Sequence, residues 1–213
     1  MTEQKAVMVY GAGISGRGAA EVLAQHGKRV YIYNDTDCQL DAALVQQLEA
    51  VGGGFVCGAE AFGKLLPQTE LIVLSPGVPA DAENVLLAEQ KGIEVISEVE
   101  LGYRLFGGHI AAITGTNGKT TTTTLVGEML KHLDVPSAVG GNIGLALSKE
   151  VEQLPENGWL AAELSSFQLE KVQSFCPDIA VVLNLTPDHM ERHHTMEAYG
   201  NAKKHIFTQQ GPE

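Results

Sequence analysis

The chain has few cysteines and little positive charge, and each shortage narrows the class of protein. Its 213 residues include three cysteines, Cys38, Cys57 and Cys176, and no pair of them has the C-x-x-C spacing of metal or redox motifs. We therefore expect free thiols in a reducing compartment. The 14 lysines and arginines against 26 aspartates and glutamates give a formal net charge of −12. This charge disfavours nucleic acid or an anionic membrane as the main partner.

Long apolar runs are also missing. No stretch approaches the roughly 18 consecutive apolar residues of a membrane span, and the apolar run near the amino terminus, residues 6–10, is too short for a signal peptide. A hydrophobic content of 44% and a charged content of 19% are typical of an ordinary soluble globular protein. We expect a cytoplasmic monomer with one large domain or two modest ones.

A strand, a glycine loop and a helix follow one another between residues 109 and 131. Residues 110–113 are apolar and predict a buried parallel strand. The loop at 114–118 contains two glycines, which let a ligand approach the backbone closely. The helix then opens at Lys119, where the helix dipole and the lysine charge favour an anion, and the hydroxyl of Thr120 can reach a phosphate-bound Mg²⁺. Ile113 replaces the first glycine of the usual G-x-x-x-x-G-K-[ST] pattern, so we predict a variant phosphate loop.

A second glycine motif lies near the start of the chain. The apolar run at residues 6–10 is followed at once by Gly11-Ala12-Gly13-Ile14-Ser15-Gly16, which matches G-x-G-x-x-G. A helical pattern and a strand at 29–33 come next, and this strand leads to Asp35. The βαβ unit predicts a Rossmann-like phosphate-binding domain. Its ligand is either NAD, with Asp35 on the ribose, or another diphosphate such as a UDP-sugar.

Strands and helices continue to alternate up to residue 106. The apolar strand at 71–74 leads into Ser75-Pro76-Gly77-Val78-Pro79, a rigid turn at the carboxyl end of a strand, where open α/β sheets bind ligands. Gly107-Gly108 is the best domain boundary in the sequence. We therefore predict the α/β class, with a Rossmann-like domain at 1–107 and an incomplete P-loop ATPase-like domain at 108–213.

Polar residues follow the strands of the second domain. Glu163 stands at the tip of a strand at 159–162, where Mg²⁺ ligands of the Walker B type occur. The strand at 179–183 leads to Asp188 and His189, but no cysteine is near enough in sequence to favour zinc. We expect His193 and His194 to be solvated. From charge alone, we expect the same of Lys203 and Lys204 on a helix at 199–207.

Four sequence runs together carry a family resemblance. They are Gly-Thr-Asn-Gly-Lys-Thr at 115–120, Gly-Gly-Asn-Ile-Gly at 140–144, Glu-Leu-Ser-Ser-Phe-Gln-Leu-Glu at 163–170 and Asn-Leu-Thr-Pro-Asp-His-Met at 184–190. With them the chain resembles the Mur ligase family, the ATP-dependent amide ligases of peptidoglycan synthesis, over residues 7–207. Within the family it looks like the type that joins D-glutamate to UDP-N-acetylmuramoyl-L-alanine through an acyl phosphate. The resemblance implies ATP and Mg²⁺ as cofactors.

The resemblance also implies a role for each site residue. Lys119, His189 and Lys203 would be catalytic, and Lys203 would be carbamylated. The ATP loop would comprise Gly115, Thr116, Asn117, Gly118, Lys119, Thr120 and Thr121. The metal ligands would be Thr120, Glu163, His189 and the carbamylated Lys203. The substrate would contact Ile14 and Ser15 at its diphosphate, Asp35 and Thr36 at its uracil, and also Ser75, Asn142, Ser165 and Gln168.

Three alternatives stay open at this stage. An NAD-dependent oxidoreductase would use the G-x-G-x-x-G motif but leaves the Gly-Lys-Thr loop without a role. A P-loop ATPase acting on a protein partner leaves the first domain unexplained. A relative in the same family that adds a different amino acid is the third. Because the family's C-terminal domain, which carries the D-glutamate site, lies beyond Glu213, we expect this chain to be a fragment that does not ligate alone.

Overall fold

The computed structural model describes residues 5–210, so the chain ends predicted for the two domains at residues 1 and 213 lie outside the described residues. The chain divides into two compact α/β units between Glu98 and Val99. This division comes before the boundary predicted at Gly107-Gly108, because helix α5 (Glu98–Leu105) packs into the second unit. Val99 on α5 is fully buried in the core of that unit.

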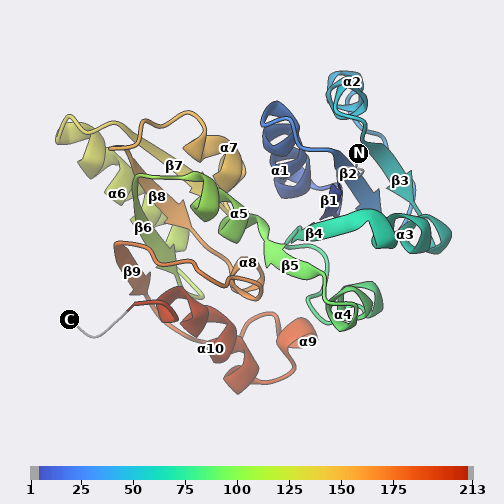
Figure 1. The fold of residues 1–213 in the computed structure, drawn as a ribbon. Helices are drawn as coiled ribbons and strands as arrows, with labels where there is room; N and C mark the ends of the chain where they lie inside the picture. The colour runs from blue at the N-terminus through green and yellow to red at the C-terminus, as the bar shows by residue number, and fades with distance from the viewer. Residues whose placement is uncertain (1–4, 211–213) are drawn as a thin grey trace. The chain divides into compact units, whose positions relative to one another are not determined.

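The first unit contains a five-stranded parallel sheet in the order β3-β2-β1-β4-β5. The chain moves outward from β1 through β3 and then returns to the other side of β1, so the strand order reverses between β1 and β4 (Figure 1). In open α/β sheets, ligands bind at the carboxyl ends of strands at such a reversal. The strands are β1 (Ala6–Tyr10), β2 (Val30–Asn34), β3 (Gly54–Cys57), β4 (Thr69–Leu74) and β5 (Glu94–Ser97).

The helices of the first unit connect these parallel strands. They are α1 (Ile14–Gln25), α2 (Ala42–Ala50), α3 (Ala59–Leu65), the 3₁₀ turn η1 (Leu66–Gln68) and α4 (Glu83–Gln90). The strands predicted at 6–10, 29–33 and 71–74 match β1, β2 and β4 to within two residues, and the predicted alternation of strands and helices is confirmed. Helix α3 was not predicted, because a helix of this length gives little periodic signal. It nevertheless buries Phe62 and Leu65 in the core beside Tyr10 and Tyr33.

The second unit contains a four-stranded parallel sheet in the order β7-β8-β6-β9. Its strands are β6 (His109–Thr114), β7 (Ser137–Gly141), β8 (Trp159–Glu163) and β9 (Ile179–Val182). Helix α6 (Lys119–His132) packs against β6, β7 and β8 (Figure 1). Because the strands are parallel, their carboxyl ends lie at one edge of the sheet, and this edge holds the residues predicted for the site. The predicted α/β class is therefore confirmed in both units.

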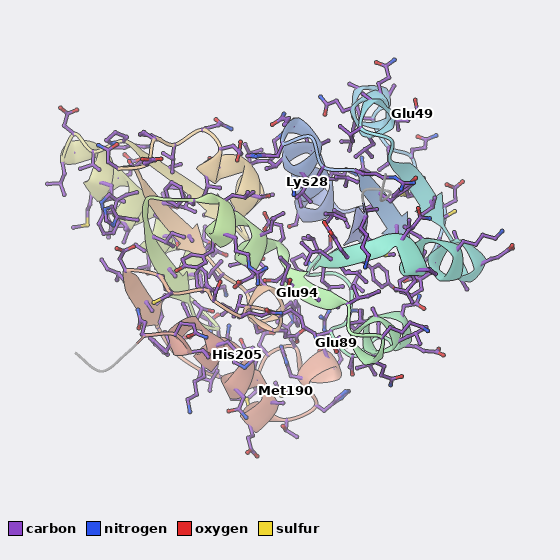
Figure 2. All side chains as sticks on the ribbon, viewed as in Figure 1. Lys28, Glu49, Glu89, Glu94, Met190 and His205 are labelled. Atoms are coloured by element: carbon purple, nitrogen blue, oxygen red, sulfur yellow. The ribbon has the colours of Figure 1, made fainter. Side chains whose placement is uncertain are left out.

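Several short helices surround this edge and were not predicted. They are α7 (Leu147–Val151), α8 (Ser166–Leu169) and α9 (Met190–His193). Helix α10 (Met196–Lys204) and the 3₁₀ turn η2 (His205–Phe207) replace the single helix predicted at 199–207. Figure 2 labels Met190 at the start of α9 and His205 on η2, and Nδ1 of His205 lies 2.9 Å from the carbonyl oxygen of Leu169.

Cys38, Cys57 and Cys176 are free thiols, as predicted. Among residues 5–210, no helix combines the length and the apolar character needed to cross a membrane.

A buried carboxylate ties α5 to the segment before β9. Glu100 is fully buried and accepts hydrogen bonds from the backbone N–H groups of Gln173, Ser174 and Phe175, and from the Ser174 hydroxyl. Arg104 donates to the same carboxylate over 2.8 Å. Burial alone would raise the pKa of Glu100, but the hydrogen bonds from Ser174 and Gln173 outweigh it, so the pKa lies below its ordinary value.

We predict that Glu100→Gln lowers the free energy of unfolding by about 2–3 kcal/mol, because several N–H groups lose a charged acceptor. Since the folded pKa is depressed, this contribution is present above the unfolded value of about 4.3 and is lost as pH falls through the folded value. Urea unfolding at neutral and acidic pH measures it. The exposed Glu156→Gln serves as the control. An equal effect of the two substitutions at neutral pH would contradict the assignment.

Candidate active site

The loop between β6 and α6 has the backbone geometry of an anion site. Gly115 and Gly118 have φ angles of 150° and 83°, in the region that favours glycine. A Cβ on Gly115 would also lie 3.1 Å from Cβ of Leu183. Gly118 is the N-cap of α6 and has no side chain to cap the helix, so the N–H groups of its first turn face the loop without a side-chain cap from that position.

Two ammonium groups meet at one carbonyl oxygen of this loop. Lys119 Nζ donates to Gly115 O over 2.9 Å and to Thr116 O over 2.8 Å. Lys203 Nζ, from α10, donates to the same Gly115 O over 2.9 Å and to Thr114 Oγ1 over 3.3 Å. Two positive charges at one carbonyl oxygen, within a chain of net charge −12, form a local site for an anion.

The two adjacent lysines of α10 differ in environment. Lys203 is 3% exposed, with its Nζ 4.7 Å from the centre of the Tyr199 ring, whereas Lys204 is exposed. The expectation from charge alone, that both face solvent, is therefore wrong for Lys203 and right for Lys204. Burial of the Lys203 amine, reinforced by the charge of Lys119, lowers its pKa to about 8.

Glu163 ends β8 as a buried carboxylate with one oxygen free. It is 2% exposed, and its Oε1 accepts a hydrogen bond from Asn142 Nδ2 over 3.0 Å. Within residues 5–210, its Oε2 has no hydrogen-bond partner. A buried oxygen of this kind is costly unless it has a ligand. A carboxylate oxygen is a ligand type that suits Mg²⁺.

The backbone holds Asn142 beside Glu163. Asn142 N donates to Glu163 O over 2.8 Å. Gly141 has a φ of 102°, and a Cβ there would lie 2.3 Å from Glu163 O. Gly141 therefore serves the close approach of the ends of β7 and β8, whereas a Cβ on Gly140 would meet the side chain of Glu150 on α7.

The loop after β9 is bonded to the phosphate loop. The Asn184 side chain accepts from Asn117 N and donates to Asn117 O, both over 2.9 Å. Thr116 Oγ1 donates to Thr186 O over 3.0 Å and accepts from Thr186 N. Asn184 was predicted only as part of a motif and had no role of its own. Its position directly after a predicted strand was the available signal.

His189 is placed beside the site without a metal cluster around it. It is the N-cap of α9 with a φ of 53°, and its ring lies 5.0 Å from the Phe167 ring. In the described part of the chain, no three His, Cys, Asp or Glu side chains are grouped to hold a metal ion. The metal roles of His189 and Thr120 stay predictions, as does the ATP contact of Thr121. Both threonines are exposed in the first turn of α6.

Ser165 and Gln168, predicted to bind substrate, bond to each other. The Gln168 side chain accepts from Ser165 N over 2.9 Å, and Ser165 Oγ accepts from Gln168 N over 3.3 Å. These two bonds form the capping box of α8. The pair therefore shapes the turn after Glu163, and direct substrate contact stays a prediction.

His193 was predicted to be solvated, and this prediction is wrong. The residue is 7% exposed and lies 2.8 Å from Ser166 Oγ through its Nε2. Burial lowers its pKa, against the opposing charge of Glu170. His194, in contrast, is exposed as predicted.

In the first unit, the glycine motif and the turn after β4 meet. A Cβ on Gly16 would lie 1.9 Å from Gly11 O, so only glycine lets α1 approach the end of β1. Ser75, which is 5% exposed, donates from its hydroxyl to the same Gly11 O over 2.9 Å. Ser75 thus shapes the loop, while Ile14, which is 76% exposed, and Ser15 begin α1.

Two buried tyrosines hold Asp35 at the end of β2. Tyr10 and Tyr33 donate to Asp35 Oδ1 over 2.8 Å and 3.1 Å. Burial and the hydrogen bond to Asp35 raise the pKa of Tyr33 to about 12. The tyrosines were predicted only as strand residues. Thr36 is positioned through its carbonyl oxygen, which accepts from Asn34 Nδ2 over 2.8 Å.

Comparison with known protein families identifies both units. Residues 5–97 match the Mur ligase MurD-like N-terminal domain, and residues 113–213 match the Mur ligase middle domain. The chain therefore consists of Mur ligase N-terminal and middle domains.

Individual relatives show which members of the family the chain is similar to. The chain is 43% identical over 209 residues to a UDP-N-acetylmuramoylalanine--D-glutamate ligase of Lachnoclostridium phytofermentans, covering 98% of this chain and 46% of the relative. A protein of the same name from Lachnospira eligens is 44% identical over 214 residues, with 98% and 46% covered. The chain thus spans about half the length of the curated relatives that it matches.

Solved structures agree on the fold. A UDP-N-acetylmuramate:L-alanyl-gamma-D-glutamyl-meso-diaminopimelate ligase from Neisseria meningitides matches with a TM-score of 0.59 at 20% identity, over 99% of this chain and 69% of that chain. A murein peptide ligase from Psychrobacter arcticus matches with a TM-score of 0.57 at 17% identity, over 95% and 46%. At these identities, the likeness concerns the fold alone.

We predict that Gly16→Ala destabilises the first unit by about 1–3 kcal/mol, because the new Cβ displaces the loop at Gly11. Denaturant unfolding measures the effect. Gly13→Ala is the matched control for stability, since a Cβ there would have no described neighbour within 4 Å. Equal unfolding curves for Gly16→Ala and the unchanged chain would contradict this account of the glycine motif.

Proposed function

We propose that this chain is part of an ATP-dependent ligase that joins D-glutamate to the L-alanyl carboxylate of UDP-N-acetylmuramoyl-L-alanine. The relatives that carry this activity in their names match both units along nearly the whole chain. The structural observation that carries the proposal is the site at the carboxyl edge of the second sheet. There, two lysine ammonium groups lie at Gly115 O, and the same edge bears Glu163 with its free Oε2.

The second unit is proposed to bind the ATP phosphates. The N–H groups at the start of α6 and the charge of Lys119 favour a polyphosphate at the loop. Lys119 Nζ bonds to two carbonyl oxygens of the loop, a position from which it can turn to a phosphate. The Asn184 side chain holds the backbone of Asn117 by two hydrogen bonds, so the loop is preorganised to bind a phosphate.

Glu163, with Thr120, is proposed to hold Mg²⁺. The free Oε2 of Glu163 is a buried oxygen that a cation would satisfy, and Asn142 fixes the carboxylate through Oε1. Bound Mg²⁺ would neutralise the charge of the β- and γ-phosphates during phosphoryl transfer.

Lys203 is proposed to be carbamylated in the enzyme. Its lowered pKa of about 8 increases the share of the neutral amine, which is the form that attacks CO₂. The product would carry oxygen atoms near the phosphate loop, and His189 would join it at a second metal. A ¹³C carbamate signal that Lys203→Arg lacks would report this modification.

The first unit is proposed to bind the UDP part of the substrate rather than NAD. Its glycine loop, with Ile14 and Ser15 at the start of α1, would face the diphosphate. Asp35, held by two buried hydroxyl groups, presents its carboxylate at the end of β2, where it can accept a hydrogen bond from the uracil imide. Thr36 would lie beside it at the same end of the strand.

The proposed reaction has two steps, and in each step one bond forms and one breaks. A carboxylate oxygen of the L-alanyl group attacks the γ-phosphorus of ATP, and the bond to ADP breaks, which leaves an acyl phosphate. The amine nitrogen of D-glutamate then attacks the acyl carbon, and the C–O bond to phosphate breaks as the amine loses a proton. Positioning and the neutralisation of clustered negative charge supply most of the catalysis.

We predict that Lys119→Ala weakens ATP binding to this chain with or without Mg²⁺, because the lysine contacts the phosphates directly. Glu163→Gln should weaken binding, by about tenfold, only when Mg²⁺ is present, because its partner is the cation. Calorimetric titrations with ATP, in Mg²⁺ and in EDTA, measure both effects. The exposed Lys204→Ala is the control. An equal loss for Glu163→Gln in Mg²⁺ and in EDTA would refute its metal role.

A further inference from the structure

His193, at the end of α9, is a buried histidine to which the proposed chemistry gives no role. The side chain is 4% exposed, and its Nε2 shares a hydrogen bond with the buried Ser166 hydroxyl over 2.8 Å. Because an unpaired polar group in this position would be costly, the bond fixes the plane and the direction of the imidazole ring.

The imidazole ring joins three helices. It stacks on the Phe167 ring of α8, with the centres 5.3 Å apart and the planes at 19°. It also contacts the Tyr199 ring of α10, with the centres 5.1 Å apart. The side chain of His193 therefore contributes to the packing of α8, α9 and α10 against one another.

Two charged residues, Glu170 and Arg192, also lie around the imidazole ring of His193. Glu170 Oε1 lies 3.7 Å from His193 Nδ1, and Glu170 Oε2 accepts from Arg192 over 2.9 Å. The Arg192 guanidinium lies 4.4 Å from the centre of the Phe167 ring. The same two residues thus restrain His193 and Phe167 together.

Each aromatic neighbour of His193 contacts the candidate site. The Phe167 ring lies 5.0 Å from the His189 ring. The Tyr199 hydroxyl lies 3.1 Å from Thr116 Oγ1 in the phosphate loop, and its ring lies 4.7 Å from Lys203 Nζ. A displacement of His193 would therefore shift Phe167 and Tyr199. Through Phe167 it would move His189, and through Tyr199 it would move the phosphate loop and Lys203.

We propose that His193 is a positioning residue, which acts through Phe167 and Tyr199 to hold His189 and Lys203 in place beside the phosphate loop. This inference rests on the proposed ATP site. His193 reaches the site only through its neighbours, so its loss should change MgATP binding by the second unit and leave UDP binding by the first unit unchanged.

The test compares four variants of the 213-residue chain by calorimetry with MgATP and, separately, with UDP. His193→Leu removes the hydrogen bond and the imidazole, whereas His193→Gln keeps a polar group that can reach Ser166. Ser166→Ala removes only the hydrogen bond and keeps the ring, so it remains informative if His193→Leu does not fold. His194→Gln, at the exposed neighbouring position, is the matched control.

The expected result is that His193→Leu and Ser166→Ala bind MgATP about tenfold more weakly, with UDP affinity unchanged. His193→Gln should recover part of the loss, and His194→Gln should match the unchanged chain. Wild-type affinity for MgATP in a folded Ser166→Ala and in His193→Leu would overturn the positioning role alone. Failure of the unchanged chain to bind MgATP would instead refute the ATP site, and this inference with it.

Discussion

The candidate site of the second unit is built around one carbonyl oxygen, that of Gly115. It accepts hydrogen bonds from both Lys119 and Lys203. Like charges repel, so this arrangement is favourable only because the loop and the buried hydroxyl of Thr114 supply acceptors. The same repulsion and the burial of Lys203 lower its pKa to about 8. A polyphosphate bound at this position would neutralise the charge of Lys119.

The parallel sheets explain how distant residues reach each site. Thr114, Gly141 and Glu163 end adjacent strands of the second sheet, so one edge carries the phosphate loop and the candidate magnesium ligand. In the first sheet, Tyr10 and Leu74 end neighbouring strands, which places Ser75 against the glycine loop. Except for the free Oε2 of Glu163, the polar side chains that shape the two sites are themselves hydrogen-bonded, and this preorganisation suits a reaction that depends on positioning.

The sequence predicted the strands and the glycine loops because apolar runs and glycine spacing are local signals. Charge alone could not distinguish Lys203 from Lys204, which only the family resemblance separated, because the packing of α10 decides which lysine is buried. Charge and hydropathy likewise predicted a solvated His193, whereas a hydrogen bond to Ser166, far away in the sequence, makes its burial favourable. Helix α8 was missed because its capping box spans a single turn, too short for a periodic pattern.

The most direct test of the whole account is a calorimetric titration of the 213-residue chain with UDP-N-acetylmuramoyl-L-alanine, with NADH as the comparison ligand. Our account predicts that the UDP-sugar binds and that NADH does not. The reason is that Asp35 is proposed to bind the uracil and the glycine loop the diphosphate. Binding of NADH without binding of the UDP-sugar would contradict it. That result would instead favour the alternative that the G-x-G-x-x-G motif belongs to an NAD-dependent oxidoreductase.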